Sequence, residues 1–170
     1  MKGKNEQGFT LIELLIVVAI ILIIAAIAIP NLMRSKMAAN EASAVGSVRT
    51  INTAMVTYSS SWGIGYAADL TSLGSSAAGA CTATSTNACL IDNILTGGTK
   101  SGYNFVAAGT LPNNGINNGF EVNATPATVG QTGQRAFCSD QSGVIRFNTT
   151  GTAIGTSAGN CAAVTTTLGN

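Results

Sequence analysis

A continuous run of apolar residues near the start of the chain dominates the pattern of hydrophobic and polar positions. Between Phe9 and Ile29 only Thr10 and Glu13 are polar, and from Leu14 onward no polar side chain interrupts the run. A helix rises about 1.5 Å per residue, so this stretch spans roughly 30 Å, the thickness of the hydrocarbon layer of a bilayer. The pattern therefore predicts a membrane-spanning helix.

Beyond this run, the pattern predicts that the helix continues in amphipathic form. Pro30 removes one backbone hydrogen bond and clashes one turn back, so it predicts a kink. Apolar residues then recur three or four positions apart and form one stripe, with polar residues between them that should face away. We expect one helix from about Phe9 to Ser60. The stripe contains Met37, Ala44, Val48, Ile51, Met55, Tyr58 and Trp62, and the polar residues are Asn40, Ser47, Arg49, Asn52 and Ser59.

The rest of the chain has the alternation typical of short strands. Residues 62–102 are rich in Gly, Ser, Thr, Ala and Asn and predict a long connection. Polar and apolar residues alternate at 103–106 and 119–124, and residues 135–147 indicate a hairpin with a Gly-containing turn. Three or four antiparallel strands on one helix face give an α+β fold. We expect this sheet, within 103–170, to pack on the C-terminal half of the helix, while the apolar half protrudes.

Charge and composition narrow the possible functions. Charged residues are only 9%, with 8 Lys and Arg against 7 Asp and Glu, and no basic cluster indicates a nucleic-acid partner. The chain has no histidine, the commonest residue in acid–base catalysis and transition-metal sites. This absence does not exclude an enzyme, but it removes the commonest catalytic side chain, and we expect no enzymatic activity, no metal and no cofactor. Asp140 is interpreted as a turn cap in preference to a calcium ligand. Asn123 and Asn148 begin N-glycosylation patterns, a weak signal.

Four cysteines, all downstream of the apolar run, favour disulfides in an oxidising compartment. No pair has the two-residue spacing of a zinc site. Four cysteines allow three connectivities. The short separation of Cys81 and Cys89 favours their pairing, which would leave Cys138 and Cys161 as the second bridge.

Three interpretations compete for the apolar segment: a signal anchor, a secretory signal cleaved near Ala26-Ile27-Ala28, and a leader cleaved before the apolar run. Lys2 and Lys4 predict a cytoplasmic start, although Arg34 and Lys36 on the far side weaken this argument. The three interpretations differ in whether they provide a positively charged partner for the Glu13 carboxylate.

A carboxylate at membrane depth costs about 2.5–3.5 kcal/mol, so Glu13 needs a role. Cleavage between Gly8 and Phe9 would create an ammonium group one helical turn before Glu13. The two charges attract strongly in a low-dielectric setting and offset each other's desolvation. The cut would also leave six basic and six acidic side chains in the mature chain.

The run Gly8-Phe9-Thr10-Leu11-Ile12-Glu13, together with the apolar residues through Pro30, resembles the class III leader and helix start of type IV pilins and type II secretion pseudopilins. The resemblance covers roughly residues 8–58. It implies that a prepilin peptidase cleaves after Gly8 and methylates the Phe9 amine. It further implies that Glu13 pairs with the Phe9 amine of a neighbouring subunit. It agrees with a small antiparallel sheet packed on the long helix.

Five segments are therefore expected: a leader at 1–8, a membrane and filament-core helix at 9–30, its amphipathic continuation at 31–61, a connection with a disulfide at 62–102, and the sheet with a C-terminal disulfide loop at 103–170.

The resemblance implies a type IV pilus subunit that starts in the bacterial inner membrane and ends in a surface filament of identical copies. Assembly would need an inner-membrane platform and a cytoplasmic ATPase. The main alternative is a periplasmic pseudopilin or a minor pilin. A membrane-tethered binding domain and a secreted enzyme are more distant alternatives.

Overall fold

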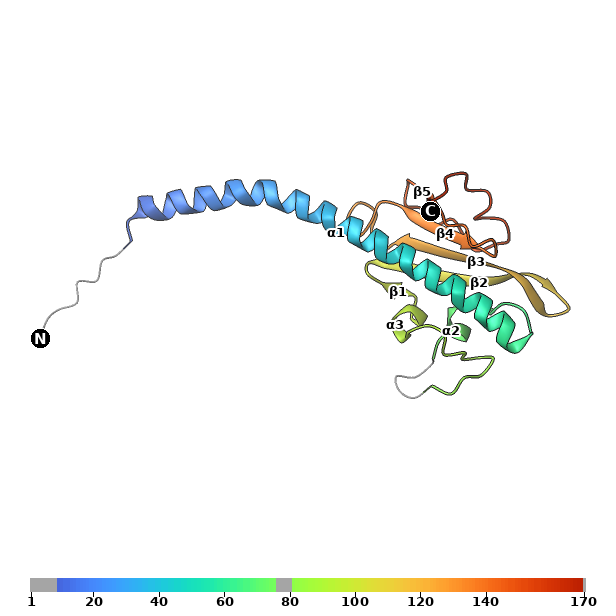
Figure 1. The fold of residues 1–170 in the computed structure, drawn as a ribbon. Helices are drawn as coiled ribbons and strands as arrows, with labels where there is room; N and C mark the ends of the chain where they lie inside the picture. Colours follow the sequence, from blue (N-terminus) through green and yellow to red (C-terminus); the bar gives the residue numbers. More distant parts are fainter. Residues whose placement is uncertain (1–8, 76–80, 170) are drawn as a thin grey trace, which may run out of the picture. The chain divides into compact units, whose positions relative to one another are not determined.

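The computed structural model describes residues 9–75 and 81–169 and contains one long helix, two short helices and five strands (Figure 1). The long helix, α1, spans Leu11–Trp62. The chain divides into two compact units, Met1–Lys36 and Met37–Asn170, so the boundary lies inside α1. The other elements are α2 (Leu70–Leu73), α3 (Asn93–Thr96), β1 (Thr99–Lys100), β2 (Tyr103–Asn113), β3 (Ile116–Pro126), β4 (Ala136–Asp140) and β5 (Arg146–Asn148).

All five strands form one antiparallel sheet in the order β1-β2-β3-β4-β5. The predicted α+β class is confirmed, with more sheet than the alternation indicated. Strands β2 and β3 extend over 11 residues each and form one long hairpin, and β1 adds a short edge. The last strand, β5, begins two residues later than the predicted segment 144–147. Consecutive strands are neighbours throughout, which keeps every connection short.

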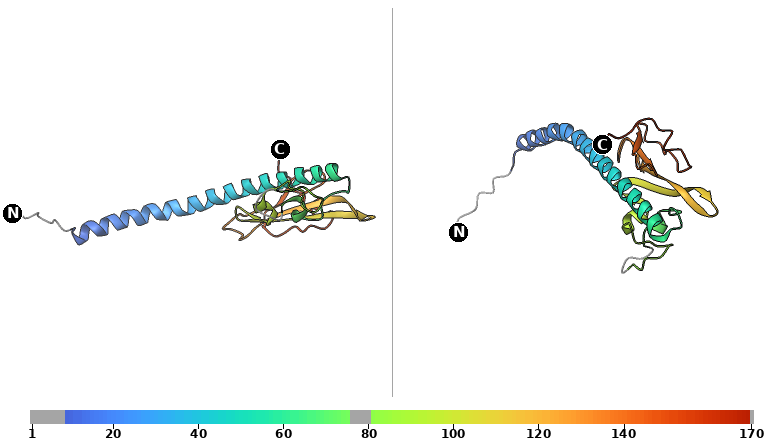
Figure 2. Two further views of the ribbon diagram at one scale, coloured as in Figure 1. Left: turned by 90° about the horizontal axis from the view of Figure 1, so that it is seen from below. Right: turned by 45° about the vertical axis from the view of Figure 1, so that its right-hand side comes forward.

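The second unit has its core between the C-terminal part of α1 and one face of the sheet (Figure 2). Five residues of the predicted stripe are buried, whereas Met37 and Trp62 are only half-buried. Alternate residues of the strands meet the helix, as the period of two requires. The buried stripe residues are Ala44, Val48, Ile51, Met55 and Tyr58, and the sheet contributes Tyr103, Phe105, Ala107, Phe120, Val122, Ala124 and Phe137.

Three polar positions of α1 that were predicted to face away are instead buried or bonded to the sheet and its β3–β4 connection, so that part of the prediction was wrong. Ser47 is buried. Asn40 donates from Nδ2 to the Thr132 carbonyl at 2.8 Å, and Asn52 donates from Nδ2 to Ser139 Oγ at 2.7 Å. These side chains border the stripe, and a helix on a sheet buries an arc wide enough to include them. Each amide therefore gains a partner on the sheet side of the helix.

The segment between α1 and the sheet was predicted as a connection with a disulfide, and it also contributes to the core through two capped helical turns. Asp69 accepts from Ser72 N at 2.8 Å to start α2, and Asp92 accepts from Leu95 N at 2.8 Å to start α3. Such capping satisfies amide groups that a short helix leaves free. The leucines that follow, Leu70, Leu73 and Leu95, are buried in the core.

Two aromatic rings lie stacked at the C-terminal end of α1. The ring centroids of Tyr58 and Trp62 are 5.1 Å apart, a separation typical of a favourable aromatic pair. The Tyr58 hydroxyl also donates to the Ser85 carbonyl at 2.6 Å. This end of the helix is therefore joined to the segment that carries the first disulfide.

Candidate assembly segment

Glu13 and Thr10 form a capping box at the start of α1. The Thr10 backbone N–H and hydroxyl donate to Glu13 Oε2 at 2.9 and 2.8 Å. In return, the Glu13 backbone N–H donates to Thr10 Oγ1 at 3.3 Å. This reciprocal pattern satisfies donors that a helix start leaves free. It engages one carboxylate oxygen of Glu13, and the described contacts leave Oε1 open to a further donor.

The apolar part of α1 presents its side chains outward in the first unit. Nearly every residue from Leu11 to Ile29 is exposed, and Phe9 is exposed as well. Within the described residues, α1 is the one helix long and apolar enough to cross a membrane by length and composition. Burial of apolar surface is the dominant favourable term in association. This surface therefore fits either lipid or other apolar helices.

Pro30 lies inside α1, and the helix continues through it to Trp62. A proline inside a helix removes one backbone hydrogen bond, and the flanking turns here are regular enough to remain helical on both sides. The kink at Pro30 stays a prediction. Gly8, the predicted cleavage residue, lies outside the described residues.

Two disulfides join the four cysteines. Cys81 bonds to Cys89 with a Cα–Cα distance of 6.1 Å, and Cys138 bonds to Cys161 with a distance of 5.6 Å. Both distances lie in the usual range for disulfides. The second bridge ties the C-terminal segment to strand β4 and is completely buried.

A buried glutamate that the sequence reasoning missed holds the same C-terminal segment. Glu121 in β3 is 2% exposed, and its carboxylate accepts from Gly159 N at 2.7 Å and Cys161 N at 3.1 Å. Burial raises the pKa of Glu121, and these two amide donors oppose the shift. The strand alternation places Glu121 on the sheet face opposite Phe120 and Val122, so the C-terminal segment covers the face that α1 leaves open.

A second missed glutamate joins α1 to the sheet. Glu41 accepts from the backbone N–H groups of Gln134 and Arg135 at 2.9 and 3.1 Å, and its Oε2 lies 2.7 Å from the Arg135 guanidinium. Burial acts to raise the pKa of Glu41, but these hydrogen bonds together outweigh it and lower the pKa. Arg135 also lies over the rings of Phe137 and Phe147, at 5.5 and 5.0 Å.

Asp140 has the turn role that the sequence favoured. Its carboxylate accepts from Ser142 N at 2.8 Å and from the Ser142 hydroxyl, and it forms an ion pair with Arg146 at 3.2 Å. No group of three potential metal-ligating side chains occurs in the part of the chain that the structure describes. Of the two glycosylation patterns, Asn123 is buried and the Asn148 amide donates to the Thr152 carbonyl at 2.7 Å.

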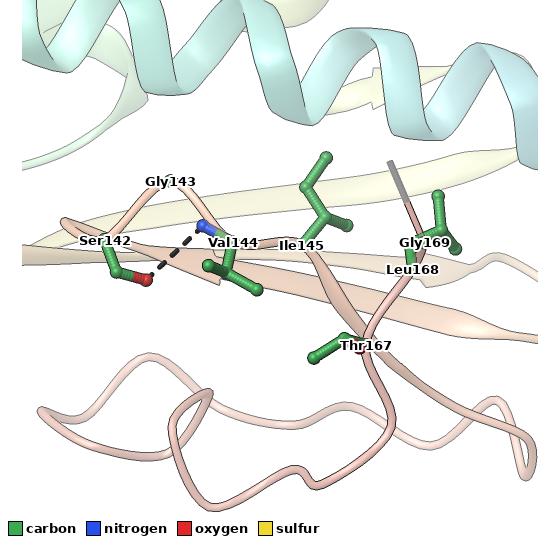
Figure 3. Close-up of a pocket in the computed structure, with 7 residues that line it drawn as sticks. All are labelled: Ser142, Gly143, Val144, Ile145, Thr167, Leu168 and Gly169. Carbon is green, nitrogen blue, oxygen red and sulfur yellow. Dashed lines mark hydrogen bonds between the residues drawn. The ribbon is translucent and has the colours of Figure 1, made fainter.

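Two surface hollows lie among the described residues, and neither has the lining of a catalytic site. One, of about 390 Å³, lies between the β4–β5 turn and the C-terminal segment (Figure 3). Its lining has no ionisable side chain, and the Val144 N–H donates to Ser142 Oγ at 3.3 Å inside it. A second hollow, of about 380 Å³, lies beside α1 and contains Arg49 together with the Glu41–Arg135 pair. Neither combines a nucleophile with a base.

Comparison with known proteins points to the same N-terminal segment. The prokaryotic N-terminal methylation motif matches residues 3–29. The type IV wide pilus major component PilA4 of Thermus thermophilus is 60% identical over 38 residues, which is 22% of this chain and 29% of that protein. Type II secretion system core protein G of Aeromonas hydrophila is 34% identical over 58 residues, 34% of this chain and 41% of that protein. Its counterpart from Pectobacterium carotovorum is 34% identical over 56 residues, 33% of this chain and 36% of that protein.

The chain thus matches less than half the length of each of these relatives. No solved structure matches it significantly. The motif nevertheless covers most of the apolar run, and the fold has the long helix and antiparallel sheet that the sequence predicted. The chain therefore carries the prokaryotic N-terminal methylation motif at residues 3–29 and is similar, over up to about a third of its length, to a type IV pilus component and to type II secretion core proteins G.

Proposed function

We propose that this chain is a structural subunit of a type IV pilus. The observation that carries the proposal is the exposed apolar helix that begins with the Thr10–Glu13 capping box. Cleavage after Gly8 and methylation at Phe9 would give a mature chain anchored by residues 9–30 in the inner membrane. A prepilin peptidase, an assembly platform and a cytoplasmic ATPase would act on it, as the family implies. The helices of many copies would then bundle into the core of a surface filament.

Glu13 is the proposed assembly residue. Its Oε2 is occupied by the two Thr10 donors, and Oε1 stays open for the Phe9 amine of a neighbouring copy. The capping box therefore lowers the cost of holding this carboxylate in an apolar setting, and the second oxygen supplies the intermolecular contact. An ammonium and a carboxylate in a filament core would attract far more strongly than in water.

A pseudopilin of a type II secretion system is the second candidate. The matches to core protein G cover 56 and 58 residues, more than the 38 residues matched to the pilus protein, although with lower identity. In this case the same cleavage and helix packing would build a short periplasmic filament.

The intact mass of the protein in filaments sheared from the cell surface tests the proposal. We expect the mass of residues 9–170 with one added methyl group and four hydrogens lost to the disulfides. If the processed chain is absent from sheared filaments and present in the inner membrane, the pseudopilin or minor-pilin function replaces the pilus function. A mature chain that retains residues 1–8 would contradict both.

A further inference from the structure

The tip of the β2–β3 hairpin is an exposed Asn-Gly turn. Asn113 pairs with Ile116, which leaves Asn114 and Gly115 as a two-residue turn. Both have positive φ, 51° and 80°, as a type I′ turn requires. Both are exposed, and a Cβ atom placed on Gly115 would meet nothing within 4 Å. Water therefore reaches the dipeptide from several sides.

The tip is weakly attached to the rest of the sheet. Leu111 has φ 52°, a strained conformation for a bulky residue, and it precedes Pro112, which has no backbone N–H to donate. The register pairs Thr110 with Gly119 and Pro112 with Asn117 but omits Leu111 and Asn118 between them. A segment with an interrupted ladder and exposed backbone opens at low free energy.

The next attachment lies just below the tip. Asn117 is held by the loop after α1, since its carbonyl accepts from Tyr66 N at 2.9 Å and its Nδ2 donates to the Tyr66 carbonyl at 3.2 Å. Opening is therefore confined to residues 111–116. Within the described part of the chain, the Asn114 side-chain amide forms no hydrogen bond that would hold it in place.

From this geometry we infer that Asn114 is a site of spontaneous deamidation. The Gly115 backbone nitrogen attacks Cγ of Asn114, the new N–C bond closes a five-membered succinimide, and the side-chain nitrogen leaves as ammonia. Water then opens the ring at either carbonyl and gives aspartate or isoaspartate. The net reaction consumes one water and releases one ammonia. Glycine favours the attack because no Cβ atom shields its nitrogen.

The same hairpin contains an internal control. Asn118 and Gly119 form a second Asn-Gly pair four residues later, inside β3. The Asn118 amide donates to the carbonyls of Leu111 and Ile116, although at 3.4 and 3.5 Å, and Gly119 is buried with Thr110 Oγ1 only 2.9 Å from where a Cβ atom would lie. Gly119 is paired with Thr110 in the ladder, so its nitrogen cannot approach Cγ of Asn118 unless the sheet opens beyond residues 111–116.

The modification would change the local charge. Residues 111–117 contain no ionisable side chain. Deamidation adds one negative charge at the tip, and isoaspartate also adds a methylene to the backbone of a turn that depends on two positive φ angles. Long-lived copies of the chain would therefore differ from new ones at this surface, whatever assembly contains them.

The test is peptide mapping of the full-length chain in detergent, aged at mildly alkaline pH, with isoaspartate detection and ammonia release measured together. We expect Asn114 to convert about tenfold or more faster than Asn118 in the folded protein, the ratio that a difference of about 1.4 kcal/mol in opening free energy gives. In denaturant the two pairs should convert at similar rates. Asn114→Gln should abolish the fast release of ammonia, and Asn114→Asp should reproduce the charge of the product.

Two results would overturn the inference. The first is an Asn114 that stays intact in the folded chain while the denatured chain converts at both positions. The second is equal conversion of Asn114 and Asn118 in the folded chain, which would show that the tip has no special reactivity.

Discussion

Three glutamates show how one side-chain type acquires three roles from its surroundings. Glu13 caps a helix start in an apolar segment. Glu41 joins α1 to Arg135, and Glu121 holds backbone amides of the C-terminal segment. Each carboxylate accepts backbone N–H groups, which are donors that a fold cannot leave unsatisfied when buried. The polar contacts of this chain therefore depend on a few specific carboxylates and not on its net charge.

Glu13 can be tested with two substitutions that separate its cap from its charge. Glu13→Gln keeps an oxygen for the Thr10 donors but removes the charge, whereas Glu13→Ala removes both. If an ion pair with the Phe9 amine drives assembly, both variants should insert into the membrane and both should lose filaments at least about tenfold, since more than about 1.4 kcal/mol per contact is lost. Counting sheared filaments and membrane-bound subunits measures this. Near-normal filaments from Glu13→Gln would show that only the cap matters.

Glu41 should contribute measurably to the stability of the folded unit. Glu41→Ala leaves two backbone N–H groups and Arg135 without their acceptor, so we expect the free energy of unfolding to fall by about 2–3 kcal/mol in urea titrations followed by circular dichroism. Lys100→Ala is the matched control, because its ion pair with Asp92 at 3.0 Å is more exposed and should contribute less than about 1 kcal/mol. Equal losses would contradict the role given to Glu41.

The pH dependence of Glu41 has a definite sign. Its pKa is lower in the folded than in the unfolded chain, so its contribution is present above the unfolded value of about 4.3 and is lost as pH falls through the folded pKa. Glu121 has a raised pKa, so its own effect is opposite: stability falls as pH rises from the unfolded to the folded value. The difference between wild type and Glu41→Ala isolates Glu41, and it should shrink only below about pH 4.3. A difference that grows on acidification would contradict this assignment.

At the scale of elements, α1 serves two environments with one continuous helix. Its first part has apolar residues on every side, and its second part has one stripe that faces the sheet. From Gly119 to Ala124, strand β3 is likewise buried on both faces, by α1 on one side and by the C-terminal segment on the other. Because both faces are covered here, water cannot solvate the Glu121 carboxylate, and backbone N–H groups of the C-terminal segment take its place.

The second disulfide should matter more than the first. Replacing Cys138 and Cys161 by alanine should lower the free energy of unfolding by about 3 kcal/mol and expose residues 149–160 to proteases, because the loop is long and its bridge is buried. Replacing Cys81 and Cys89 removes a shorter and more exposed loop, and the sheet should stay resistant. Limited proteolysis with mass spectrometry compares the two. Equal resistance of both variants would show that Glu121 alone holds the segment.

The sequence predicted the periodic elements and missed those that depend on single contacts. The stripe of α1 and the alternation in the strands are repeating signals, and they gave the α+β fold and most of the helix face. The tip of the long hairpin had a signal in Asn114-Gly115, which favours a type I′ turn, and Thr10-x-x-Glu13 had the form of a capping box. Glu41 and Glu121 had no local signal, because their partners lie far away in the sequence.

At the scale of the whole molecule, two units with opposite surfaces share one chain. The buried core lies entirely within the second unit, whereas the first unit has an exposed apolar surface. Such a surface needs lipid, detergent or other copies around it. The chain therefore combines a folded unit that buries its own apolar core with a helix whose apolar residues remain exposed.

This division predicts how truncated chains behave. A chain that begins at Met37 should stay monomeric without detergent and unfold cooperatively, since every core residue is retained. A chain that begins at Phe9 should need detergent. Analytical ultracentrifugation and urea unfolding measure both properties. Aggregation of the shorter chain, or unfolding without cooperativity, would show that the first 36 residues support the fold.

The stacked pair at the end of α1 gives the protein its own spectroscopic probe. Trp62 is the single tryptophan in the chain, half-buried against the core and in contact with Tyr58. Its fluorescence should shift to longer wavelength if the helix end leaves the sheet and the indole meets water. One unlabelled chain could therefore be followed by emission through membrane insertion, extraction and polymerisation, and any change would report on the folded unit, since the apolar segment contains no competing indole.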